Sequence, residues 1–190
     1  MTDKFENKYR IPSARLQHWD YRWAGAYFIT ICTQNREHYF GEIAKGQMQL
    51  SEIGKIAETE WLKTFELRPD MNLYQGEFVV MPNHLHAIIG IGENEFNTPS
   101  RRDAMHCVST NEPNEPQNQF GPQSKNLASV VRGFKSSVTI AARNINPDFQ
   151  WQSRFHDHII RNDESFQKIT NYIISNPANW QDDKFYKAKP

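Results

Sequence analysis

The chain has 190 residues, which indicates one domain long enough to bury a core, and its 22 Lys and Arg equal its 22 Asp and Glu. This zero formal charge argues against a protein that coats nucleic acid by overall charge alone, although a local basic patch could still bind phosphates. Cys32 and Cys107 form no CxxC motif and no run is apolar enough to span a bilayer, so we expect a cytoplasmic protein without a thiolate zinc site, a disulfide framework or a membrane span.

The N-terminal residues 1–23 interleave basic and aromatic side chains, among them Arg10, Arg15 and Arg22. Two interpretations stay open at this point. The segment is either a surface arm whose rings pack on the body, or a contact for the backbone and bases of a nucleic acid.

The first half of the chain predicts a strand, a helix and a hairpin. Residues 26–35 are β-branched and aromatic, as strands are, and residues 50–65 have helical apolar spacing after Ser51, a suitable N-cap. The apolar runs 74–81 and 84–91 are separated by Pro82-Asn83, which suits the centre of a tight turn.

The second half begins with a segment of a different kind. Residues 92–124 are rich in Asn, Pro, Gln and Glu and predict a flexible insertion. After it we expect a helix over 126–144, a strand over 149–161, and a helix from 163 towards 180 with Asp163 as N-cap, stopped by Pro177. The order of elements predicts one α+β domain over 1–190, a mainly antiparallel sheet with helices packed on it.

Two histidines, His84 and His86, stand one residue apart in the apolar run 84–91. Residues i and i+2 of a strand face the same side, so both rings can bind one divalent cation, provided that another element supplies a third ligand. The alternative is two ordinary strand histidines that are hydrogen-bonded to neighbours. A second such pair, His156 and His158, could be another arm of a zinc site, or could pack and hydrogen-bond locally.

The last predicted helix carries Tyr172 and Asn176, four residues apart and on one flank of its apolar stripe. Asn176 lies at the C-terminal end, where the helix dipole favours a cation, and a carboxamide oxygen is a suitable ligand for a hard divalent ion. Taken alone, Tyr172 could equally be a boundary residue and Asn176 a simple helix cap.

The combination MPNHLH with a downstream Y-x-x-x-N-P resembles a known family. Together with the stretches at 27–41, 127–138 and 155–177, it is similar to the HUH single-strand endonucleases, specifically the REP-associated branch of the single-tyrosine transposases of the insertion-sequence type. The resemblance implies an HUH endonuclease fold, ferredoxin/RRM-like, with His84 and His86 as metal ligands. It also implies Asn176 as the third ligand, Tyr172 as nucleophile, and Mg²⁺ or Mn²⁺ as the ion.

The implied activity is cleavage and rejoining of single-stranded DNA at hairpins, through a covalent bond between Tyr172 and the 5′ phosphate. A single strand is held by stacking and by groove charge. The candidate basic contacts are Arg10, Arg15, Arg22, Arg132, Lys135, Arg154 and Arg161.

Two other functions remain open. One is a domesticated, catalytically silent protein that binds DNA hairpins. The other is a zinc hydrolase that uses both histidine pairs, although the chain has no HExxH motif to supply a base. The sequence also leaves open a monomer or a homodimer, and whether Tyr172 meets His84 and His86 within one chain.

Overall fold

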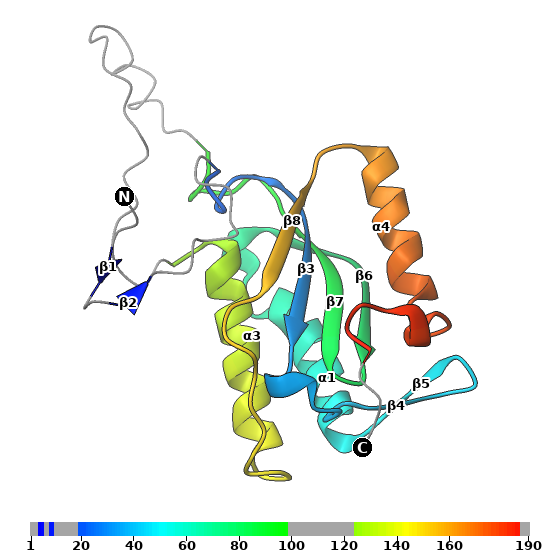
Figure 1. Cartoon of the computed structure of the whole chain (residues 1–190). Helices are drawn as coiled ribbons and strands as arrows, with labels where there is room; N and C mark the ends of the chain where they lie inside the picture. Colours follow the sequence, from blue (N-terminus) through cyan, green and yellow to red (C-terminus); the bar gives the residue numbers. More distant parts are fainter. Residues whose placement is uncertain (1–3, 6–7, 10–18, 99–123, 187–190) are drawn as a thin grey trace, which may run out of the picture.

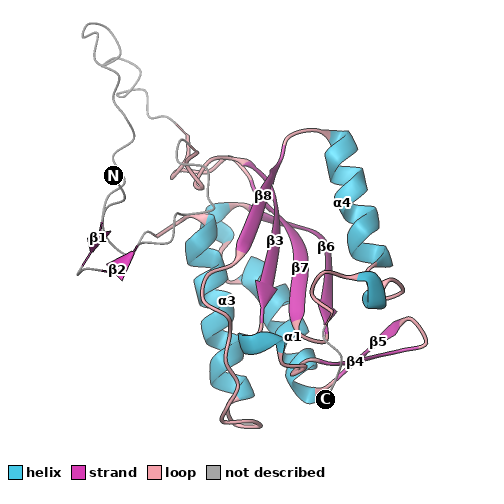
Figure 2. Ribbon diagram, viewed as in Figure 1, coloured by secondary structure: helices cyan, strands magenta, loops and turns pink. Residues whose placement is uncertain are grey.

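The structure, a computed structural model, describes residues 4–5, 8–9, 19–98 and 124–186. Its centre is a four-stranded antiparallel sheet in the order β6-β7-β3-β8 (Figure 1). The strands are β3 (Gly25–Cys32), β6 (Leu73–Met81), β7 (His84–Ile91) and β8 (His156–Ile160). The helices are α1 (Glu52–Glu66), α3 (Leu127–Ala142) and α4 (Asp163–Ser175). The predicted α+β architecture is therefore confirmed (Figure 2).

Smaller elements complete the described chain. The strands β1 (Lys4–Phe5) and β2 (Lys8–Tyr9) pair with each other, as do β4 (Gly41–Ala44) and β5 (Gln47–Leu50). Three short 3₁₀ helices are η1 (Gln34–Arg36), η2 (Pro69–Met71) and η3 (Trp180–Asp182). No helix in the described ranges is both long and apolar enough to cross a membrane.

The central strand β7 is buried along its whole length because both faces of the sheet are covered there. On one face Leu85, Ala87 and Ile89 join the main core with residues of α1 and α3, including the fully buried Trp61. On the other face Ile88 packs with Ile173 of α4. Strands buried on both sides read as continuous apolar runs, which explains why 84–91 shows little alternation.

The Pro82-Asn83 turn forms as predicted and joins β6 to β7. Ser51 also caps α1 as predicted, because its side chain accepts a hydrogen bond from the Gly54 backbone N–H. The N-cap of α4 was predicted wrongly. Asn162 accepts from the Ser165 N–H, whereas Asp163 is the first helical residue and its charge favours the positive end of the helix dipole.

Two elements are shorter than expected, and one hairpin was missed. The strand predicted over 149–161 is regular only over His156–Ile160, because Trp151 makes an isolated bridge to Thr33 and a loop follows. The last helix was predicted to run from 163 towards 180, but α4 ends at Ser175, about one turn earlier. The 3₁₀ helix η3 follows as a separate element. The β4–β5 hairpin was missed, since its strands are short and its turn uses Lys45 and Gly46 at positive φ.

The predicted insertion 92–124 lies mostly outside the described residues, which omit 99–123. Its first residues contact the body, as the Asn94 side chain donates a hydrogen bond to the carbonyl of Met71. The flexible insertion and the single domain over 1–190 both stay predictions.

Candidate active site

The histidine pair lies at the start of β7, and both rings are on the face of the sheet covered by α4. His84 is 0% and His86 1% exposed, with ring centroids 4.3 Å apart. The period of the strand puts them side by side, as predicted from the sequence.

The orientation of His84 is fixed by its neighbour Asn83. The Asn83 amide nitrogen donates to the carbonyls of Arg36, at 3.3 Å, and Phe185, at 3.0 Å, which directs its oxygen to His84 Nδ1 at 2.8 Å. Because this amide oxygen can only accept, Nδ1 carries the proton and Nε2 keeps its lone pair. Within the described part of the chain, the buried Nε2 has no hydrogen-bond partner.

His86 is held from both of its nitrogens. Its Nδ1 lies 2.9 Å from the Thr30 hydroxyl, which can donate or accept, and its Nε2 lies 3.1 Å from the Tyr172 hydroxyl. Burial is the main cause that lowers the pKa of His84 to about 3, and burial also lowers the pKa of His86 well below its usual range. Both rings are therefore neutral near pH 7, the form in which imidazole binds metals.

Helix α4 brings Tyr172 over the sheet. Its apolar side chains Phe166, Ile169 and Ile173 pack against the face that carries Ile88. Tyr172 is 38% exposed, so its hydroxyl reaches His86 while the ring stays open to solvent. The hydroxyl also donates to Asp183 Oδ2 at 3.2 Å. Burial and the Asp183 carboxylate raise the pKa of Tyr172 above its ordinary value.

Asn176 and Asp183 complete the cluster. Asn176 is the C-cap of α4 and only 2% exposed. Its amide nitrogen donates to Asp183 Oδ2 at 2.7 Å, and its buried oxygen has no partner among the described residues. Oδ1 of Asp183 accepts from the Phe185 N–H at 2.6 Å. Sequence reasoning missed Asp183, because it follows Pro177 in an irregular segment where no periodicity places it near the histidines.

The resulting group can hold a cation. One ligand atom each from His84, His86 and Asp183 lies within 4.8 Å of the other two. The unpartnered His84 Nε2 and Asn176 oxygen are two further signs that a positive ion fits here, since a buried polar atom without a partner is costly. The donors are imidazole nitrogens and oxygens, a mixture compatible with Mg²⁺ or Mn²⁺.

The second histidine pair lies on the same sheet face. His156 is the Cα partner of Thr30, and His158 is the partner of Phe28, on the edge strand β8. Both side chains are exposed and neither belongs to the group of His84, His86 and Asp183, which is the one such cluster in the described ranges. The arrangement favours two separate roles for the two pairs.

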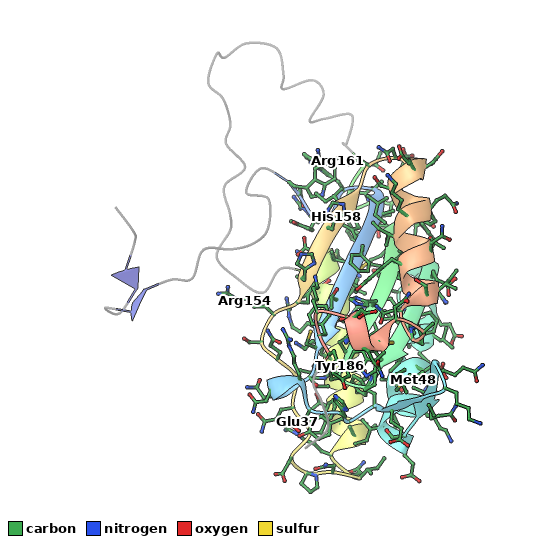
Figure 3. All side chains as sticks on the ribbon, turned by 45° about the vertical axis from the view of Figure 1, so that its right-hand side comes forward. Glu37, Met48, Arg154, His158, Arg161 and Tyr186 are labelled. Carbon is green, nitrogen blue, oxygen red and sulfur yellow. The ribbon has the colours of Figure 1, made fainter. Side chains whose placement is uncertain are left out.

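Of the predicted basic contacts, the structure brings three to one groove. Arg10 and Arg15 lie outside the described residues, and Arg22 forms an exposed ion pair with Asp20. Arg132, Lys135 and Arg154 line one groove. Arg161 is exposed just after β8, and Figure 3 shows Arg154, His158 and Arg161 in order along this edge. Their contact with nucleic acid stays a prediction.

Comparisons with known proteins give a family and a fold. No family model matches the chain. A Haemophilus influenzae protein, named only as an uncharacterized protein, is 39% identical over 178 residues, covering 92% of each chain. A solved structure of a REP-associated tyrosine transposase bound to a REP hairpin is similar with a TM-score of 0.56 and 19% identity. That match covers 90% of this chain and 74% of the other. The chain therefore belongs to the family of the Haemophilus influenzae protein and has a fold like that of the transposase.

Proposed function

We propose that this protein cleaves and rejoins single-stranded DNA that carries hairpins, as a single-tyrosine HUH transposase of the REP-associated type. The observation that carries the proposal is the position of the Tyr172 hydroxyl. It lies 3.1 Å from His86 Nε2 and 3.2 Å from Asp183 Oδ2, beside the one group of His, Cys, Asp or Glu side chains among the described residues that could hold a metal ion. The similar fold of a transposase bound to a DNA hairpin supports the substrate class.

The proposed step is a transesterification. The Tyr172 oxygen attacks the scissile phosphorus, the bond from phosphorus to the 3′ oxygen breaks, and the DNA keeps its 5′ phosphate on the tyrosine. The leaving strand ends in a 3′ hydroxyl. One ester replaces another, so the reaction needs no nucleotide triphosphate, and a 3′ hydroxyl can reverse it to join strands.

The proton of Tyr172 has a defined acceptor. Asp183 Oδ2 already accepts a hydrogen bond from this hydroxyl, and we assign Asp183 as the base that takes the proton during attack. An acceptor is needed because the pKa of Tyr172 is raised, so the free phenolate is scarce at neutral pH. The 38% exposure of Tyr172 leaves its ring accessible to a strand from solvent.

The ion would be held by His84 and His86, with Asn176 and Asp183 as the oxygen donors. When bound there, Mg²⁺ or Mn²⁺ would supply positive charge to polarise the phosphate and to stabilise negative charge in the transition state. Asn83 and Thr30 orient the two imidazoles through hydrogen bonds to their Nδ1 atoms, as partners of metal-bound histidines usually do.

The test uses labelled single-stranded hairpin DNA from the sequences that flank the gene, incubated with Mn²⁺. We expect a covalent protein–DNA adduct with the intact protein and none with Tyr172→Phe. Tyr74→Phe, which alters another exposed tyrosine on β6, is the matched control and should keep the adduct. Hairpin binding by all three proteins without any adduct would instead identify a catalytically silent hairpin-binding protein.

A further inference from the structure

A groove separates α3 from the segment that leads into β8, where the two run side by side (Figure 1). Its volume is about 500 Å³, within the range of small-molecule sites. The side chains that line it come from two consecutive parts of the chain: Ala128, Val131, Arg132, Lys135, Ser136, Thr139, Ile140, Arg154 and Phe155.

The polar lining is cationic and contains no acidic side chain. Arg132 and Arg154 are exposed, and within the described ranges neither guanidinium is in an ion pair. Arg68 adds positive charge near Arg132, since burial and then the Arg132 guanidinium lower the pKa of Arg68. Such a concentration of uncompensated charge favours an anionic ligand.

Lys135 shapes the groove instead of offering a free charge. Its Nζ donates to the carbonyls of Gln152 at 2.7 Å and Arg154 at 3.1 Å. The Trp151 indole donates in turn to the Lys135 carbonyl at 3.1 Å. These bonds tie the loop to α3, so that Arg154 is presented from a fixed position, with its backbone at a φ of 66°.

The rest of the lining is apolar, with Val131 buried, Phe155 half-buried and Ile140 72% exposed. A large apolar side chain this exposed beside two arginines provides surface for a flat, uncharged group. A nucleotide combines a flat, uncharged base with a charged phosphate. In an unpaired nucleotide both the base and the phosphate are exposed to a binding partner. A duplex turns its bases inward and presents mainly phosphates, so it would leave the apolar wall uncovered.

We propose that this groove binds an unpaired nucleotide of a DNA single strand, with its base against Ile140 and Phe155 and its phosphate at Arg132 and Arg154. The inference rests on the proposed function for the identity of the polymer. It adds a subsite that lies outside the cluster around Tyr172.

The groove is near enough to the candidate active site to guide one strand. Phe155 directly precedes His156, which pairs with Thr30, and Thr30 pairs with His86. Two interstrand spacings, roughly 10 Å, therefore separate the start of β8 from His86. A strand held in the groove could cross the edge strand β8, past the exposed His156 and His158, towards Tyr172.

The experiment measures the affinity of a fluorescein-labelled single strand by anisotropy over a series of salt concentrations, in the Tyr172→Phe background, which prevents cleavage. We expect Arg154→Gln to weaken binding roughly tenfold, as for the loss of a charged hydrogen bond. It should also reduce the slope of log affinity against log salt by about 0.7, because one phosphate contact is removed. Lys55→Gln, which removes an exposed cation from α1, is the control and should change neither value.

A second variant tests the apolar wall. Ile140→Ser should weaken single-strand binding without altering the salt slope, and because Ile140 is exposed the fold should tolerate it. A duplex of the same sequence should bind both proteins equally. The proposal is overturned if Arg154→Gln binds like Lys55→Gln, or if Ile140→Ser weakens duplex and single strand alike.

These results are independent of the chemistry at Tyr172. An adduct in the intact protein together with unchanged binding by Arg154→Gln would refute the groove and leave the proposed function standing. A reduced salt slope without any adduct would support the groove as a single-strand site and refute the nuclease.

Discussion

Replacing His84 by glutamine should make the protein less sensitive to acid. The native ring is buried and its pKa is lowered to about 3 from an ordinary value of 6.5. Below pH 6.5 the unfolded chain binds a proton that the folded chain does not. The free energy of unfolding is therefore unaffected by protonation of His84 above pH 6.5. It decreases as the pH falls from 6.5 towards 3, because protonation of His84 then favours the unfolded chain.

The size of the effect follows from these two values. At 1.36 kcal/mol per pKa unit, the full difference corresponds to about 5 kcal/mol, and the part lost between pH 8 and pH 4 is about 3 kcal/mol. This is a large share of the ~5–15 kcal/mol by which domains are usually stable. The glutamine side chain of His84→Gln does not titrate, and its amide can still donate to the Asn83 oxygen that His84 Nδ1 contacts at 2.8 Å.

The assay is urea unfolding of both proteins at several pH values between 4 and 8, with chelator present so that metal binding does not contribute. The free energy of unfolding of the wild type should fall by about 3 kcal/mol more than that of His84→Gln over this interval. All other titratable groups are the same in both proteins, so the comparison isolates the change at position 84 together with its electrostatic effect on the pKa of neighbouring His86. Parallel stability curves for the two proteins would refute the reasoning.

Three further predictions concern the site and its support. Asn83→Ala removes the acceptor that fixes the tautomer of His84, and should weaken Mn²⁺ binding about 10–100-fold in calorimetric titration; equal affinity would contradict the role of Asn83. Asp183→Asn removes the proton acceptor and a charged ligand, and should slow adduct formation by about 10²-fold or more in single-turnover assays at saturating Mn²⁺, whereas an unchanged rate would exclude it as the base. Gly54→Ala should destabilise the fold by about 1–3 kcal/mol in urea despite the better helix propensity of Ala, because its Cβ would lie 2.2 Å from the Phe40 carbonyl oxygen; a more stable variant would show that this contact relaxes.

The sequence alone determined the local geometry of the candidate site. A strand repeats every two residues, so His84 and His86 had to share a face once 84–91 was a strand. A helix repeats every 3.6 residues, so Tyr172 and Asn176 had to be neighbours on α4. These relations follow from backbone geometry within one element, and they need no knowledge of how the elements pack.

Only the tertiary structure decided which elements meet. It placed α4 over the face of β7 that carries the histidines, through the packing of Ile88 with Ile173. It also brought Asp183 to the group with His84 and His86 from a segment without regular periodicity. Asn83, expected only as a turn residue, became the partner that orients His84.

The groove beside α3 is another product of packing. Arg132 and Arg154 are 22 positions apart in a sequence whose total charge is zero, so composition gives no sign that their charges combine. They come together because hydrogen bonds from Lys135 hold the loop before β8 against the helix. Periodicity places side chains within an element, whereas contacts between elements depend on how buried surfaces fit across the whole fold, and no short stretch of sequence contains that information.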